Sequence, residues 1–260
     1  MTRRIVALVL VALATGGVAP AFAKGSGGSA PPPAQKASHD EEAAVFIQDV
    51  VTTRSSQNDD AAVSSAKHLS GIWKDTAVTA GTKQPIPGLL LWYARRKSSS
   101  VALAGIAALG DLGKGPGSQN LTRVLEGLLA QKDAPADRLT AVFAGLKSAA
   151  DPDPAVVGPL LACLANKDRQ IAMKAIDVFG ALGAATVATR RHLFDQLLAA
   201  FEPMALAAAK PEDKDAVERW ALLASPAAGA LGALSHHTHA DIAAARKWEN
   251  EHGSEADAWK

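Results

Sequence analysis

The sequence predicts an all-α fold built from stacked antiparallel helix pairs, and three observations support this prediction. The segment 101–113 superposes without gaps on the segment 171–183, an offset of 70 residues, or two units of 35. Three further segments carry apolar residues at i, i+3, i+4 and i+7, which is the stripe of an amphipathic helix. Glycine and proline fall between the segments, where helices end and begin.

Residues 1–23 are predicted to be a secretory signal peptide. Arg3 and Arg4 precede an apolar stretch that is too short for a membrane span of about 20 residues, and the segment ends in Ala21-Phe22-Ala23. We expect cleavage after Ala23 and no membrane span afterwards; an uncleaved membrane anchor is the alternative. Residues 24–39 are rich in Gly, Ser, Pro and Ala and are predicted to be a disordered tether. The predicted location is therefore periplasmic or extracellular.

Residues 98–205 are predicted to hold the regular repeats. Asn120 and Asp153 stand where helix N-caps are expected, just before the second helices of two pairs. The apolar stripes of these second helices are separated by 36 and 37 residues, so one helix pair occupies about 36 residues. The stripes are Leu121, Val124, Leu125 and Leu128; Val157, Leu160, Leu161 and Leu164; and Phe194, Leu197, Leu198 and Phe201.

The flanking regions, 40–97 and 206–260, are predicted to be helical caps, because the outermost pairs of a stack need a modified surface. Helices are expected over 41–53, 60–73, 86–96, 213–223 and 241–251. Most of the large aromatic residues lie in these flanks. Packing within the caps is the favoured interpretation, and an aromatic binding surface is the alternative. The residues concerned are Trp73, Trp92, Tyr93, Trp220, Trp248 and Trp259.

One repeat allows a resemblance to be stated. The pattern Leu161-x-x-Leu164-x-x-x-Asp168-x-x-Ile171-x-x-x-Ala175, closed by Leu182-Gly183, resembles a HEAT repeat of the short bacterial type. The resemblance covers about residues 98–201 and implies a right-handed α-solenoid whose second helices line the concave face. Many such repeats carry an arginine that pairs along the stack, but alanine stands at those positions, 102, 141 and 172. The resemblance therefore concerns architecture more than a functional subfamily.

Composition and motifs argue against several classes of function. Loss of Arg3 and Arg4 reduces the 27 basic residues to 25, against 26 acidic residues, and such a balanced chain is not expected to bind nucleic acid. Cys163 is the only cysteine, so no internal disulfide can form. The sequence has no GxSxG, HExxH, CxxC or GxxxxGK[ST] motif. We therefore predict that the protein is not an enzyme.

One dense cluster of potential metal ligands lies near the C-terminal end. Three imidazoles and a carboxylate, at His236, His237, His239 and Asp241, have the chemistry to bind Zn²⁺ or another borderline metal. A solvated surface loop is the favoured interpretation of this cluster. A metal-binding accessory protein is the second functional hypothesis, and no other cofactor is predicted.

The favoured hypothesis is an exported scaffold that holds a protein partner, because stacked helix pairs present a long curved surface. Some repeat proteins of this kind resemble phycobilin lyases, which implies a third hypothesis, a pigment-attaching enzyme. The predicted export argues against that enzyme, because pigment attachment of this type is intracellular.

The outward positions of the three second helices are the candidate binding residues. In the middle copy they are small, which predicts a shallow apolar trough with an exposed Cys163. Close packing between helices is the alternative reason for such small residues. The candidates are Thr122, Arg123 and Glu126 in the first copy, Gly158, Ala162 and Cys163 in the second, and Asp195 and Gln196 in the third.

Overall fold

The computed structural model describes residues 38–149, 154–255 and 257–260, and these residues form an all-α arrangement without strands. Helices account for 78% of them. The predicted signal peptide and nearly all of the predicted tether lie outside the described residues. Within the described part of the chain, no helix has both the length and the apolar character needed to cross a membrane.

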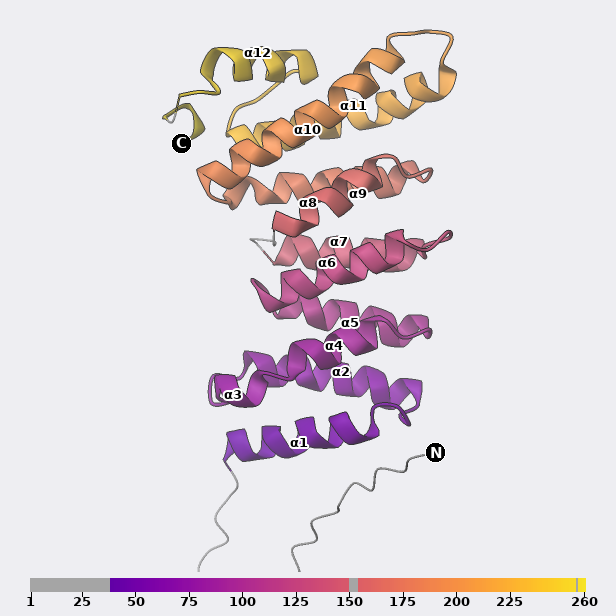
Figure 1. Cartoon of the computed structure of the whole chain (residues 1–260), viewed down its shortest axis with the longest axis vertical. Helices are drawn as coiled ribbons and strands as arrows, with labels where there is room; N and C mark the ends of the chain where they lie inside the picture. Colours follow the sequence, from indigo (N-terminus) through magenta and orange to yellow (C-terminus); the bar gives the residue numbers. More distant parts are fainter. Residues whose placement is uncertain (1–37, 150–153, 256) are drawn as a thin grey trace, which may run out of the picture. The chain divides into compact units, whose positions relative to one another are not determined.

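The helices follow one another in chain order (Figure 1). The five helices expected in the flanks are all present, with different ends in several cases. The α-helices are α1 (His39–Thr53), α2 (Asp59–Lys74), α3 (Ala80–Lys83), α4 (Ile86–Ala94), α5 (Ser99–Asp111), α6 (Pro116–Leu129), α7 (Ala136–Ser148), α8 (Val157–Leu164), α9 (Arg169–Ala181), α10 (Val187–Ala208), α11 (Lys214–Ser235) and α12 (Ile242–His252). Short 3₁₀ helices are η1 (Pro154–Val156), η2 (Leu182–Ala184) and η3 (Asp257–Trp259).

Two rows of helices pack against each other between α2 and α11 (Figure 1). Contacts join α2, α5, α7, α9 and α11 in succession, and they join α4, α6, α8 and α10 in the same way. The most extensive contacts between chain neighbours link α4 to α5, α8 to α9 and α10 to α11, each across a short connection. The sequence periodicity predicts that α5 pairs with α6, α7 with α8 and α9 with α10. Helices α5 and α6 are in contact, whereas the other two predicted pairs touch only weakly or not at all.

The apolar stripes predicted from the sequence form the core between the rows. On α6 all four stripe residues are buried, and on α10 the same is true of Phe194, Leu197, Leu198 and Phe201. On α8 the stripe residue Leu161 is only partly buried, while the other three are buried. The helical periodicity therefore identified the core-facing side of each helix correctly.

The start of α6 differs from the prediction. Asn120 was expected to cap this helix, but α6 already begins at Pro116, and Gly115 precedes it with a positive φ of 71°. Proline is suited to the first helical position because its φ is fixed and its missing N–H needs no partner there. Asn120 therefore lies inside the helix, where its Nδ2 donates to the Pro116 carbonyl at 2.7 Å. Asp153, the other predicted cap, lies outside the described residues.

Helix α11 extends well beyond the predicted end at residue 223. It continues past Pro226 to Ser235 and ends where His236 adopts a left-handed conformation with φ 60°. Proline removes one helical hydrogen bond, but the apolar side chains that follow are buried against the rest of the core. This burial explains why α11 persists through the proline. The buried residues are Ala227, Ala228, Ala230, Leu231 and Leu234.

Arginines tie neighbouring layers together from positions that the repeat resemblance did not indicate. Arg138 at the start of α7 donates to the Lys97 carbonyl in the α4–α5 connection at 2.6 Å. Arg219 on α11 donates to the Asn166 carbonyl in the α8–α9 connection at 2.9 Å. Arg169 on α9 pairs with Asp215 on α11 at 2.9 Å. These contacts link successive layers although alanine occupies the positions where an arginine ladder would stand.

Candidate functional site

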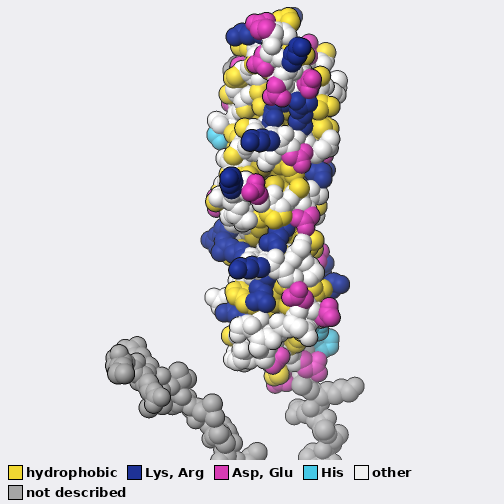
Figure 2. Space-filling model, turned by 90° about the vertical axis from the view of Figure 1, so that its right-hand side faces the viewer, with side chains coloured by type: hydrophobic (Ala, Val, Ile, Leu, Met, Phe, Trp, Pro, Cys, Tyr) yellow, Lys and Arg dark blue, Asp and Glu magenta, His cyan; other side chains and the backbone are white. Residues whose placement is uncertain are grey.

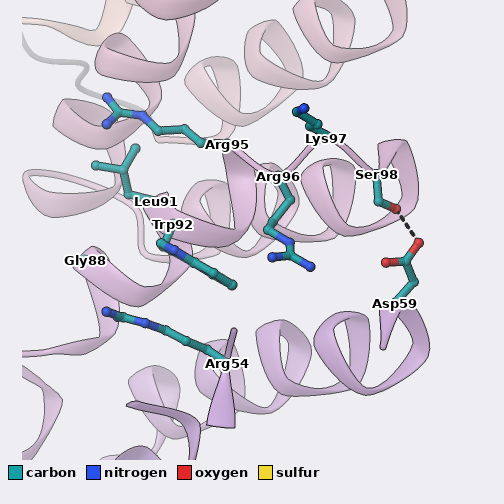
Figure 3. A pocket seen from close by; sticks show the side chains of 9 residues that line it. All are labelled: Arg54, Asp59, Gly88, Leu91, Trp92, Arg95, Arg96, Lys97 and Ser98. Carbon is teal, nitrogen blue, oxygen red and sulfur yellow. Dashed lines mark hydrogen bonds between the residues drawn. The ribbon is translucent and has the colours of Figure 1, made fainter. Parts of the chain in front are cut away.

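A basic pocket of about 820 Å³ opens where the connection between α1 and α2 meets the connection between α4 and α5. Both connections lie on the side of the molecule that Figure 2 faces, where Lys and Arg side chains gather below the middle of the view. Figure 3 shows the pocket from close by. Its lining residues are Arg54, Asp59, Gly88, Leu91, Trp92, Arg95, Arg96, Lys97 and Ser98.

The ends of three helices place these side chains around one opening. Arg54 is the residue that follows α1, and Asp59 is the first residue of α2. Helix α4 contributes Trp92 from its last turn, and its C-terminal end leads directly into the run 95–97. Residues distant in the sequence therefore meet because α1, α2 and α4 all end or begin here.

Trp92 lies between two guanidinium groups. The guanidinium carbon of Arg96 lies 4.8 Å from the indole centroid, and that of Arg54 lies 5.5 Å away. Figure 3 shows Arg96 above the indole and Arg54 below it. Each cation–π contact of this kind contributes roughly 0.5–1 kcal/mol at a partly exposed site. The tryptophan therefore favours side-chain conformations that keep both positive charges at the pocket.

The pocket carries an uncompensated positive charge. Asp59 is the one carboxylate that lines it, and this carboxylate accepts a 2.6 Å hydrogen bond from the Ser98 hydroxyl. It also stands in the first turn of α2, where negative charge complements the helix dipole. In the described part of the chain, the four cationic residues that line the pocket form no ion pair. The pocket is thus lined by four cations, and among the described residues no carboxylate forms an ion pair with them.

Hydrogen bonds under the pocket fix the connection that carries Arg54. Tyr93 is fully buried beside Trp92, and its hydroxyl donates to Gln57 Oε1 at 2.7 Å. Gln57 Nε2 in turn donates to the Ser65 hydroxyl on α2 at 3.2 Å. Burial raises the pKa of Tyr93 above its ordinary value, so this hydroxyl remains a donor. These hydrogen bonds tie Gln57, three positions after Arg54, to both α4 and α2.

Such a pocket is suited to binding oxyanions. Guanidinium groups present planar forks of N–H donors that match carboxylate or phosphate oxygens, whereas an ammonium group supplies a point charge. Its lining contains arginine, lysine, one aspartate and one serine as polar groups, without a histidine or cysteine. The chemistry of these groups is recognition of negative charge.

The structure brings most of the predicted binding residues to exposed positions on one row of helices. Arg123 and Glu126 are exposed on α6, and Gly158 and Ala162 are exposed on α8. On α10, Asp195 and Gln196 are exposed as well. Neighbouring side chains partly desolvate the Asp195 carboxyl, and together with the nearby Glu249 charge this raises the pKa of Asp195. Because α6, α8 and α10 contact one another in succession, these six residues lie on adjacent helices.

The other two predicted binding residues point inward. Thr122 is buried, and its hydroxyl donates to the Ser118 carbonyl at 3.0 Å. Cys163 has 0% exposure, so the prediction of an exposed thiol in an apolar trough was wrong. Position 163 is three residues from Leu160 and next to Leu164, which places it on the buried side of α8. Burial raises the pKa of its thiol to about 12.

The side chains of the histidine-rich segment lie beside oxygen atoms of the protein. His236 is within hydrogen-bond distance of the Gly183 and Lys260 carbonyl oxygens, at 3.0 and 3.2 Å. His237 Nε2 lies 3.1 Å from the Ala258 carbonyl oxygen, and His239 Nε2 lies 2.8 Å from the Ser235 hydroxyl. The fourth predicted ligand, Asp241, caps α12 by accepting a hydrogen bond from the Ala244 amide at 2.8 Å.

These four side chains do not converge on one point. Among the described residues, no group of three or more His, Cys, Asp or Glu side chains is placed to hold a metal ion. The ring of His237 lies 5.0 Å from that of Trp248, and Trp259 is buried beside both Trp248 and Phe194. The segment thus packs the C-terminal end onto the helices, as the packing interpretation of the terminal tryptophans predicts.

Sequence reasoning did not identify the basic pocket. The run Arg95-Arg96-Lys97 directly after Trp92 is a local signal, but it is short and lies in a chain of nearly balanced charge. Arg54 and Asp59 stand more than thirty residues earlier, and only the packing of α2 and α4 brings them to the same opening. Trp92 had been considered for cap packing and for an aromatic binding surface, and it lines this pocket.

No protein-family model matches the chain, and no curated protein matches it. The pocket and the surface on α6, α8 and α10 are therefore interpreted from their own geometry. Of the two, the pocket has the clearer chemistry, because two guanidinium groups lie within 5.5 Å of one indole centroid and neither forms an ion pair among the described residues.

Proposed function

We propose that this protein is an exported, non-enzymatic binding module that presents a HEAT-like, right-handed α-solenoid to a protein partner. The observation that carries the proposal is the basic pocket, which is lined by four cations that have no ion-pair partner in the described part of the chain. Like charges held close together repel one another, and an anionic partner that docks there relieves this repulsion. The pocket is thus built for an interaction that the protein itself does not complete.

The features that support export are in the sequence. A basic start at Arg3 and Arg4, a short apolar stretch and the Ala21-Phe22-Ala23 ending form a signal for transport across a membrane. The Gly, Ser, Pro and Ala tether that follows would separate the helical region from the point of attachment or release. We therefore place the partner in the periplasm or outside the cell.

The exposed residues on α6, α8 and α10 are proposed as a second contact surface. Gly158 and Ala162 contribute little side-chain volume, so a partner can approach α8 closely, while Arg123 and Gln196 border this strip with polar groups. This surface has the small and polar residues that the sequence predicts, except that Cys163 and Thr122 are buried and do not belong to it.

A capture experiment with charge-neutral variants tests the proposal. The mature chain, residues 24–260, would be immobilised and incubated with the envelope fraction of the producing cells. We expect one or a few proteins to be retained by the wild type and lost with the double variant Arg54→Gln/Arg96→Gln, because the guanidinium forks are removed while the chain length is nearly kept.

Lys132→Gln is the matched control. Lys132 is exposed in the α6–α7 connection and does not line the pocket, so removal of its charge should leave capture unchanged. Lys67→Gln/Lys132→Gln, which removes two exposed charges outside the pocket as the pocket variant removes two inside it, should do the same. Circular dichroism would establish that each variant is folded. Failure of the folded wild type to retain any envelope protein would contradict the proposed function.

A further inference from the structure

We infer that the basic pocket recognises an acidic peptide segment of the partner through two carboxylates, one on each side of Trp92. This inference rests on the proposed function, and it specifies the chemistry of the partner. It starts from the arrangement of Arg54, Trp92 and Arg96 (Figure 3), in which one indole separates two guanidinium groups.

The two arginines beside Trp92 compete with ligands that bind by stacking. A sugar ring or a nucleobase needs one open face of an aromatic side chain, and stacking on such a face is the main contribution of aromatic residues to the binding of single-stranded nucleic acids. Here Arg96 lies on one side of the indole and Arg54 on the other (Figure 3), with guanidinium carbons 4.8 and 5.5 Å from the centroid. The indole therefore serves as a spacer between two cations.

The spacing of the two cations matches a pair of acidic residues in a peptide. Because both guanidinium carbons lie within 5.5 Å of one centroid, they are at most about 11 Å apart. In an extended peptide, residues i and i+2 are about 7 Å apart and their side chains lie on the same face, whereas residues i and i+3 lie on opposite faces. Glutamate or aspartate at positions i and i+2 can therefore place one carboxylate against each guanidinium fork.

The lining distinguishes carboxylates from a compact phosphate group. Helix N-termini are the common sites for phosphate, but the first turn of α2 beside this pocket already carries the carboxylates of Asp59 and Asp60. These charges disfavour any anion at that end, and a compact phosphate most, because it carries the higher charge. In Figure 3 the cationic groups of Arg95 and Lys97 lie apart from each other and from the Arg54–Trp92–Arg96 group, so the positive charge is distributed, which suits a segment with several carboxylates better than one compact anion.

Leu91 and Gly88 provide an apolar part of the lining next to the charges. Gly88 is exposed, and a Cβ atom added to it would meet no other atom within 4 Å, so the surface is open above α4. A peptide backbone can lie across this region while its acidic side chains reach the arginines. The pocket volume of about 820 Å³ accommodates several residues of an extended chain.

Fluorescence anisotropy with a labelled peptide of alternating glutamate and glycine tests the inference. The mature chain should bind this peptide, and its affinity should fall as salt concentration rises, because screening weakens exposed charge pairs. Arg54→Gln/Arg96→Gln should weaken binding at least tenfold, and Lys132→Gln should leave it unchanged. The variant Arg54→Lys/Arg96→Lys keeps the charge and loses the fork, so we expect an intermediate affinity.

Three results would overturn the inference. They are equal affinity of the Arg54→Gln/Arg96→Gln variant, equal binding of a peptide of alternating glutamine and glycine, and displacement by inorganic phosphate at concentrations where chloride of the same ionic strength has no effect. If the wild type fails to bind the acidic peptide but still captures an envelope protein, the inference of an acidic segment is refuted and the proposed function stands. Absence of any capture by the wild type would refute the proposed function instead.

Discussion

Glu202 on α10 and Arg246 on α12 form a bidentate ion pair. The guanidinium donates to both carboxylate oxygens, at 2.5 and 2.8 Å, and a second carboxylate, that of Glu249, accepts at 3.0 Å. The hydrogen bonds from Arg246 hold the pKa of Glu202 below its ordinary value. A carboxylate with a depressed folded-state pKa stabilises the fold above its unfolded pKa, and that contribution is lost as pH falls through the folded value.

We therefore predict that Glu202→Gln destabilises the protein at neutral pH and not in acid. Both side chains are about one-third exposed, so we expect a cost of about 0.5–1 kcal/mol at pH 7. Urea unfolding of the wild type and the variant across pH 3–7 measures this difference, which should shrink toward the acid end. A difference that is constant across this range would mean that the ionised carboxylate contributes nothing.

The buried Cys163 gives a second prediction at the scale of one residue. Burial removes the thiol from water and raises its pKa to about 12, and only the thiolate reacts readily. The native protein should therefore react with a polar thiol reagent at pH 8 many times more slowly than the same chain in denaturant. Rapid stoichiometric labelling of the folded protein would show that the side of α8 that carries Cys163 is exposed, contrary to the structure.

At the scale of an element, the close approach of α4 and α5 depends on a glycine. A Cβ atom added at Gly105 would collide with the backbone of Tyr93 and Ala94, and it would lie only 2.8 Å from the Tyr93 carbonyl carbon. The last turn of α4 carries Trp92 and Tyr93, so this contact also positions the basic pocket. Backbone atoms cannot move aside as a flexible side chain can, and α4 would have to shift.

We predict that Gly105→Ala costs about 1–3 kcal/mol, as overpacking of a tight contact does. Gly127→Ala on α6 is the matched control, because a Cβ atom there meets nothing within 4 Å. Alanine is the better helix former, so this control should gain about 0.5–1 kcal/mol. Equal unfolding midpoints for the two variants in urea would contradict the close packing of α4 on α5.

At the scale of the whole molecule, the sequence predicted the helices and their buried sides better than their ends. The stripe on α10 was correct because apolar residues at helical spacing must share one face. The end of α11 was not predictable, because a proline at 226 normally terminates a helix and only burial of the residues after it prevents this. The sequence periodicity likewise could not show which neighbouring helices make the more extensive contacts.

The candidate site was less predictable than the fold, and the reason is also physical. Periodicity reports which side of a helix is buried, whereas the basic pocket depends on the distance between two connections, one at Arg54 and one at residues 95–98. The histidine-rich segment shows the reverse case, in which potential metal ligands adjacent in the sequence do not meet at one site. His236, His237 and His239 are close in the chain, but each contacts a different backbone or hydroxyl oxygen.

The central claim is that a protein partner docks at the basic pocket, and crosslinking in the producing cells tests it most directly. A photoreactive amino acid at Leu91, which lines the pocket, should form a crosslink to one protein of the envelope or exterior, and Arg54→Gln/Arg96→Gln should abolish it. The same probe at Lys67, exposed on α2 outside the pocket, should not capture that protein. Equal crosslinking from both positions, or a Leu91 crosslink that survives loss of both arginines, would contradict the account.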